Sequence, residues 1–79
     1  MDARPVYTSH AREALTKHEL TAEDVDAVLR SFDRERLDSD GNRRLSGPAR
    51  GRRVTVVVAK GSDPPRIITL WPTSRRRNR

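Results

Sequence analysis

Apolar residues in the first half of the chain recur at helical spacing. They fall at positions i, i+3, i+4 and i+7, which form one stripe along a helix: Val25, Val28, Leu29 and Phe32. The preceding TAED has the form of a capping box, in which Thr21 caps the helix and Asp24 reaches back. A shorter segment, residues 9–17, begins with Ser9 as its expected cap, and its apolar side consists of Ala11, Ala14 and Leu15. The pattern therefore predicts two packed helices.

Beyond Phe32 the pattern changes to the period of two that is typical of strands. RRVTVVVAK, residues 52–60, and PRIITLWP, residues 65–72, are rich in β-branched side chains and predict two strands. Residues 35–47 predict a hairpin around Asp40-Gly41, and we place Tyr7 in a short leading strand. The predicted fold is α+β, with two N-terminal helices packed on one face of a three- to four-stranded antiparallel sheet.

Alternation along the two strands predicts which side chains share a face. Arg53 and Thr55 point away from the set Arg52, Val54, Val56 and Val58. In the last strand, Thr69 and Trp71 share a face opposite Ile68 and Leu70. If the helices cover the valines with Ile68 and Leu70, the other face carries Arg53, Thr55, Thr69 and Trp71. The VVV and II runs indicate central strands that are partly covered on both faces.

The chain is short, with 79 residues, which favours one small domain over residues 1–72 and a disordered basic tail over residues 73–79. It has no cysteine, which excludes disulfides, thiolate metal sites and a cysteine nucleophile. Its two histidines, eight residues apart, match no zinc spacing, so we expect no metal and no cofactor. The longest apolar run, residues 56–59, is far too short to span a bilayer, and we expect a cytoplasmic protein.

Charge is segregated along the chain. Residues 1–40 carry six basic and ten acidic side chains, whereas residues 41–79 carry eleven basic and one acidic. Ten of those eleven are arginines, whose planar guanidinium groups match phosphate oxygens in pairs. This distribution predicts a nucleic-acid partner; the alternative is a solvated basic surface. The candidate nucleic-acid-binding residues are Arg43, Arg44, Arg50, Lys60, Arg66 and Trp71.

Five motifs occur in order between Tyr7 and Pro72: TSHA, LTAEDVDAVL, DSDGNRRLSG, GRRVTVVV and IITLWP. In this order they resemble a bacterial family of unknown function that begins with Ser/Thr-x-His-Ala and closes on an Ile-Ile-Thr strand. That family is similar to BrnT-type toxins and, more distantly, to RelE, colicin and barnase-like ribonucleases. The resemblance implies a small endoribonuclease toxin that is held by an antitoxin or immunity protein. The sequence departs from the family at Ala14 and His18, where arginine is usual.

Metal-independent RNA cleavage needs groups that exchange protons and cations around the phosphate. His10 supplies an imidazole at a predicted helix start, where free amides favour a phosphate anion. The resemblance points to Arg52 as the functional arginine, whereas strand alternation points to Arg53, and Thr69 shares the face of Arg53. The candidate catalytic residues are therefore His10, Arg52, Arg53 and Thr69. The alternatives are a capping or surface role for His10, and a non-catalytic RNA- or DNA-binding module.

Overall fold

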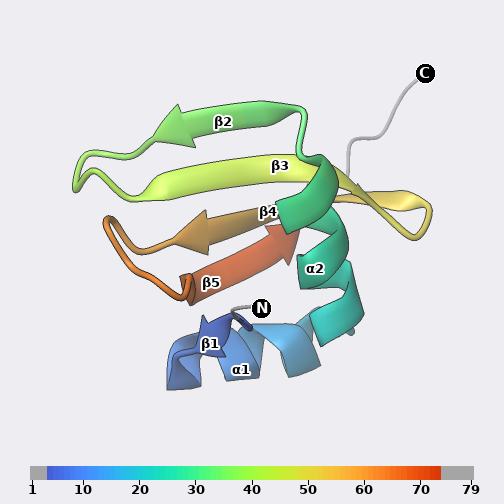
Figure 1. Ribbon diagram of the computed structural model, residues 1–79. Coiled ribbons are helices and arrows are strands. Elements are labelled where there is room, and N and C mark those ends of the chain that lie inside the picture. The colour runs from blue at the N-terminus through green and yellow to red at the C-terminus, as the bar shows by residue number, and fades with distance from the viewer. Residues whose placement is uncertain (1–3, 74–79) are drawn as a thin grey trace.

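Two helices lie on one face of a five-stranded sheet in the computed structural model, which describes residues 4–73 (Figure 1). The helices are α1 (Ser9–Lys17) and α2 (Ala22–Ser31). The strands are β1 (Val6–Tyr7), β2 (Arg34–Leu37), β3 (Arg43–Ala49), β4 (Arg52–Val58) and β5 (Arg66–Pro72). Their order across the sheet is β1-β5-β4-β3-β2. The α+β architecture with two N-terminal helices on one face is as predicted. The predicted basic tail, apart from Thr73, lies outside the described residues.

The sheet is mixed, and the expectation of three or four antiparallel strands is corrected here. β1 pairs with β5 in parallel, with Val6 beside Arg66 and Tyr7 beside Ile67, while the other neighbours are antiparallel. The Val6 N–H donates to the Pro65 carbonyl at 2.8 Å. A two-residue strand has too few positions for an alternation pattern, so the sequence could suggest a strand at Tyr7 but not its direction.

Threonine side chains begin both helices. The hydroxyl of Thr8, and not that of Ser9 as expected, caps α1 by accepting the N–H of Ala11 at 3.1 Å. The same hydroxyl lies within hydrogen-bond distance of the Ile67 and Ile68 carbonyls, which fixes the start of α1 against β5. At α2 the predicted capping box is confirmed: the Thr21 N–H donates to Asp24 Oδ2 at 2.9 Å.

The core lies between the helices and the sheet. Val25 and Val28 of the predicted apolar stripe are fully buried, whereas Leu29 and Phe32 are only partly buried. The sheet contributes the buried side chains of Leu45, Ala49, Val54, Val56, Val58, Ile67 and Leu70. Neither helix within residues 4–73 is long and apolar enough to cross a membrane.

A bulge in β5 changes the predicted face of one isoleucine. Val57 pairs with Thr69 and Val58 pairs with Ile67, so the register shifts at Ile68. Ile67 is consequently fully buried in the core, and Ile68, which was expected there, is only partly buried. Bulges insert one residue and reverse the facing on one side of the insertion. Thr69 and Trp71 keep their predicted face.

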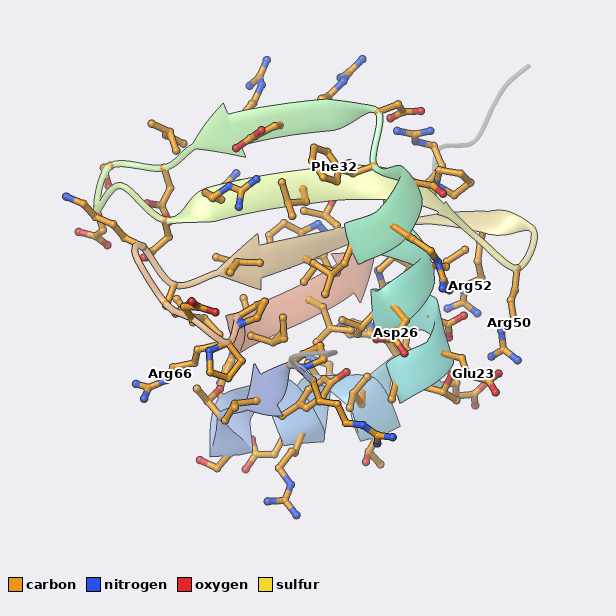
Figure 2. All side chains as sticks on the ribbon, viewed as in Figure 1. Glu23, Asp26, Phe32, Arg50, Arg52 and Arg66 are labelled. Carbon is orange, nitrogen blue, oxygen red and sulfur yellow. The ribbon has the colours of Figure 1, made fainter. Side chains whose placement is uncertain are left out.

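Gly47 allows α2 to end directly over β3. A Cβ at this position would lie 2.8 Å from the Cα of Phe32 and 3.1 Å from the Ser31 carbonyl oxygen. Any larger residue would therefore force backbone apart. This close approach leaves Phe32 above β3 (Figure 2). Asp33 then directly precedes the edge strand β2.

Candidate nucleic-acid interface

The face of the sheet opposite the helices carries a set of aligned polar side chains, which we call the helix-free face. Strand register defines two rows across β2, β3, β4 and β5. The first row consists of Arg34, Ser46, Thr55 and Trp71. The second row consists of Arg36, Arg44, Val57 and Thr69. The face predicted from alternation is thus assembled, and β2 and β3 add arginines and a serine to it.

Arg44 reaches across β4 to Trp71. Its guanidinium carbon lies 5.8 Å from the centre of the indole ring, a cation–π distance. Thr55 and Val57 lie between these two side chains in the register, and both are buried although no helix covers them. The Thr55 hydroxyl forms a 2.8 Å hydrogen bond with that of Ser46. The centre of the helix-free face is therefore an ordered surface of one aromatic ring, one cation and paired hydroxyls.

Arg53 lies at one end of this face and binds Asp33. Its two terminal nitrogens donate to the two carboxylate oxygens at 3.1 and 2.6 Å. These hydrogen bonds hold the pKa of the Asp33 carboxyl below its ordinary value. Beside the pair is an open depression of about 510 Å³, lined by Asp33, Arg34, Ser46, Arg53 and Thr73. Arg53 is thus oriented by a carboxylate and remains exposed at the rim of a depression.

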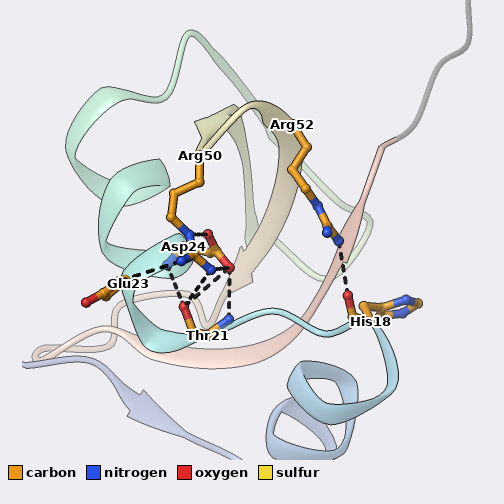
Figure 3. Close-up of polar contacts among 6 residues, drawn as sticks. All are labelled: His18, Thr21, Glu23, Asp24, Arg50 and Arg52. Atoms are coloured by element: carbon orange, nitrogen blue, oxygen red, sulfur yellow. Dashed lines mark hydrogen bonds and ion pairs between the residues drawn. The ribbon is translucent and has the colours of Figure 1, made fainter.

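Arg50 binds the protein itself at the end of the sheet beside α2 (Figure 3). Its Nε donates to Asp24 Oδ1 at 2.8 Å and a terminal nitrogen donates to Asp24 Oδ2 at 3.2 Å. This hydrogen bonding holds the pKa of the buried Asp24 carboxyl below its ordinary value, although burial acts in the opposite direction. Arg50 and Gly51 have φ angles of 50° and 86°, so they form the tight β3–β4 turn. The contacts of Arg50 are those of a structural ion pair.

We expect Arg50→Asn to weaken the acid dependence of stability. Asparagine is favoured at this turn, so the backbone is not penalised, but its side chain is too short to reach Asp24. A carboxyl whose pKa is lowered by folding stabilises the protein above its unfolded pKa of about 4 and loses that contribution as the pH falls through the folded value. The free energy of unfolding, from urea melts between pH 2 and 7, should be lower in the variant by about 1–3 kcal/mol at pH 7 and should approach that of the wild type at pH 2. An equal difference at both ends would contradict this role of Asp24.

His10 lies at the N-terminal end of α1, whereas Arg52, at the start of β4, contacts the C-terminal end of that helix. His10 is exposed in the first turn, whereas Arg52 donates to the carbonyl of His18, the C-terminal cap, at 3.0 Å (Figure 3). A rise of about 1.5 Å per residue separates positions 10 and 18 by about 12 Å along the helix. Arg53 and Thr69 lie on the helix-free face. The four candidate catalytic residues therefore occupy three places, and residues 4–73 show no hydrogen bond between any two of them.

The other predicted binding residues also lie in several places, only some of them on the helix-free face. Arg44 and Trp71 lie on the helix-free face. Arg43 forms an ion pair with Glu35 at 2.7 Å, and Lys60 lies in the β4–β5 loop, where its N–H donates to Asn42 Oδ1. Arg66 is exposed at the start of β5, at the opposite end of the molecule from Arg50 and Arg52 (Figure 2). Within the described residues no cluster of three or more His, Asp or Glu side chains is placed to hold a metal ion.

Arg34, Arg36 and Ser46 were missed as candidate residues. The signal was present, because alternation in RERL, residues 34–37, puts both arginines on one face once the strand is recognised. The face itself required the pairing partners of β2, which place Arg34 beside Ser46 and Arg36 beside Arg44. Sequence alone does not give that register.

Residues 7–72 match the model of the family described as Domain of unknown function (DUF4258). The chain belongs to this family. The DUF4258 match begins in β1 and ends at the last residue of β5, so it covers both helices and all of the sheet except Val6. The comparisons with curated proteins and with solved structures found no match. Membership of a family of unknown function is as predicted. The motif signature of that family and its further likeness to BrnT-type and RelE-like ribonucleases stay predictions.

Proposed function

We propose that this DUF4258 domain binds single-stranded RNA along the helix-free face. The observation that carries the proposal is the pairing of Arg44 with Trp71 at the centre of a face that no helix covers. Arg34, Arg36 and Arg44 form no ion pair with any acidic side chain of residues 4–73, so their charge is available to phosphates. Among the arginines that residues 4–73 place on this face, Arg53 alone is paired with a carboxylate, that of Asp33.

Unpaired bases suit this surface better than a duplex. An aromatic ring at a sheet surface stacks on an exposed base, and stacking contributes about 1–3 kcal/mol per base. Thr69, two residues before Trp71 on the same face, and the side chains that line the depression beside Arg53 provide hydrogen-bonding groups on this face. Arginines on β2 and β3 lie on one side of the ring, where the backbone of the bound strand would pass. The face thus combines the stacking and cationic elements that single-strand binding requires.

The test compares two double variants of equal charge. Arg34→Gln/Arg36→Gln removes two cations from the helix-free face, while Arg12→Gln/Arg30→Gln removes two exposed cations from the helices. Affinity for a labelled single-stranded RNA is measured by anisotropy over a range of salt. The first variant should bind more weakly and should reduce the slope of log K against log salt by about 1.4, because each phosphate contact contributes about 0.7. The second should match the wild type.

Two results would contradict the proposal. If both double variants lose affinity equally, binding reflects net charge and not this face. If the wild type fails to bind RNA at low ionic strength, the domain has a different ligand. Trp71→Phe, which retains an aromatic ring, should bind more tightly than Trp71→Leu if stacking contributes, and a melt of each variant controls for folding.

Metal-independent cleavage of RNA, as in a small ribonuclease toxin, is the second candidate function. It is favoured by the exposed His10 imidazole in the first turn of α1. There the N–H of Ala11 donates to the Thr8 hydroxyl and that of Arg12 to the Thr8 carbonyl. The N–H groups of Ser9 and His10 have no acceptor among the described residues, so they can donate to a phosphate oxygen. An imidazole beside two free amides is a reasonable site for proton transfer at a phosphate.

A further inference from the structure

The outer edge of β2 is an open strand edge. β2 is the last strand of the sheet, and no strand within residues 4–73 pairs with its outer side. All four of its residues are exposed, and Leu37 retains 68% of its surface. Val6, at the opposite edge, retains 47%, but β1 has only two residues. β2 is therefore the edge that offers both length and an exposed apolar side chain.

The hydrogen-bond pattern identifies the free main-chain groups of β2. Asp38 N–H donates to the Asn42 carbonyl at 2.9 Å, which sets the phase of the antiparallel pairing with β3. Along an antiparallel strand, the backbone N–H and C=O groups of successive residues point alternately towards the paired strand and away from it. Arg34 and Arg36 have the same parity as Asp38, so their backbone groups point towards β3. The N–H and C=O groups of Glu35 and Leu37 consequently point outward. An added strand can bond to both residues without disturbing the existing sheet.

The side chains of β2 decide what that added strand must carry. Arg34 and Arg36 project from the helix-free face and form no ion pair within residues 4–73. Glu35 projects from the helix-covered face and is already paired with Arg43 at 2.7 Å. The edge therefore presents two free cations on one face and an exposed leucine on the other.

A second copy of this chain fits the edge poorly. A symmetric antiparallel pairing that continues both faces of the sheet must place residues of the same parity opposite one another. Centred on Glu35, it sets Glu35 against Glu35 and Arg34 against Arg36; centred on Arg36, it sets Arg36 against itself. Like charges directly opposite one another destabilise a strand pair. Centred on Leu37, the pairing opposes no like charges, but Ser39 and Asp40 form the turn, so only residues 36–38 could pair. The longer pairings oppose like charges, so the charge pattern favours a different partner.

We propose that the edge of β2 binds an extended acidic segment of another protein as an added antiparallel strand. The segment carries carboxylates opposite Arg34 and Arg36 on the helix-free face and an apolar side chain opposite Leu37 on the other. Read from its N-terminus, its core is apolar, acidic, basic or polar, acidic. The main-chain bonds to Glu35 and Leu37 supply affinity, and the alternating side chains supply selectivity.

Such a partner would also control RNA binding, and this consequence rests on the proposed function. Arg34 and Arg36 belong to the helix-free face, so the carboxylates that pair with them remove two cations from the RNA surface. The added strand and the RNA should therefore compete. The edge proposal itself needs no RNA and is tested without it.

The test uses a capped peptide, Thr-Val-Glu-Lys-Glu-Thr, and a charge-swapped control, Thr-Val-Lys-Glu-Lys-Thr. Binding to the isotope-labelled chain is followed by NMR titration. Two variants at one position separate main-chain from side-chain effects: Glu35→Pro removes the outward N–H, and Glu35→Ala keeps it while removing the pair with Arg43. Proline is tolerated at an edge position whose N–H faces solvent, so both variants should retain the sheet. We expect Glu35→Pro to weaken binding by about tenfold or more and Glu35→Ala by about twofold or less.

Amide exchange of the wild type gives a readout that does not depend on a variant. With peptide, the amides of Glu35 and Leu37 should gain protection, while those of Arg34 and Arg36, which already face β3, should change little. Equal binding of both peptides, protection elsewhere, or unchanged affinity in Glu35→Pro would overturn the proposal. So would a dimer of the wild type that Glu35→Pro dissociates, because the edge would then bind a second copy. Displacement of RNA by the peptide would support competition between the two ligands. Simultaneous binding would contradict that competition but not the proposal that the β2 edge binds the peptide.

Discussion

Ile67→Ala is expected to lower the free energy of unfolding by about 2–5 kcal/mol, the range for truncating a fully buried isoleucine. Ile67 has no exposed surface and packs in the core formed by α1, α2 and the sheet. Truncation removes three carbons and leaves a cavity that the surrounding valines can fill only in part. A domain of this size has a total stability of only several kcal/mol, so the variant should be largely unfolded at modest urea concentrations.

The adjacent Ile68→Ala is the matched control, because it makes the same chemical change one residue along the same strand. Ile68 is partly exposed beside the bulge, so its truncation should cost well under half as much. Urea melts followed by circular dichroism give both values. Equal losses of unfolding free energy in the two variants, or a larger loss for Ile68→Ala, would mean that β5 alternates regularly, as expected from the sequence, and has no bulge.

The bulge marks the limit of what could be predicted from the sequence. The capping box of α2 was predictable because Thr21 and Asp24 are three residues apart and need no distant partner. The β2–β3 hairpin was predictable for a similar reason: Asp38 Oδ1 accepts the N–H groups of Asp40 and Asn42, and Gly41 takes the positive φ. The bulge arises from the match between β4 and β5, and nothing within IITL marks which isoleucine is inserted.

In the candidate site too, the local features could be predicted from the sequence and the long-range contacts could not. Alternation within single strands correctly grouped Arg53, Thr55, Thr69 and Trp71 on one face, because facing is a local property. Composition could not show which arginines are engaged by the protein itself. Arg50 binds Asp24, 26 positions away in the sequence, and Arg52 binds the His18 carbonyl, 34 positions away. Such pairings are created by the close approach of the β3–β4 turn to the helices.

The two histidines of the chain provide an internal control for the catalytic hypothesis. His10 is exposed at the start of α1 beside two free amides, whereas His18 caps the C-terminal end of the same helix, where unpaired carbonyls disfavour a phosphate. Both are single imidazoles on one short helix. A general effect of histidine on charge or folding should therefore appear in both alanine variants, and a catalytic effect should appear only at His10.

If the domain cleaves RNA, His10→Ala is expected to lower the cleavage rate by about 10²- to 10⁴-fold, the usual cost of removing one general acid or base. His18→Ala should leave the rate within about threefold of the wild type, since its side chain is remote from the free amides and its carbonyl still accepts Arg52. Neither variant should change RNA affinity, because both histidines lie on the helix side and the proposed binding arginines lie on the opposite face. Purified protein is incubated with total RNA in EDTA from pH 5 to 9, and the products are resolved on a gel.

A rate that depends on Arg53 and Thr69 but not on His10 would move the reaction to the helix-free face. Binding without cleavage at any of these pH values would leave RNA binding as the function and His10 as a surface residue.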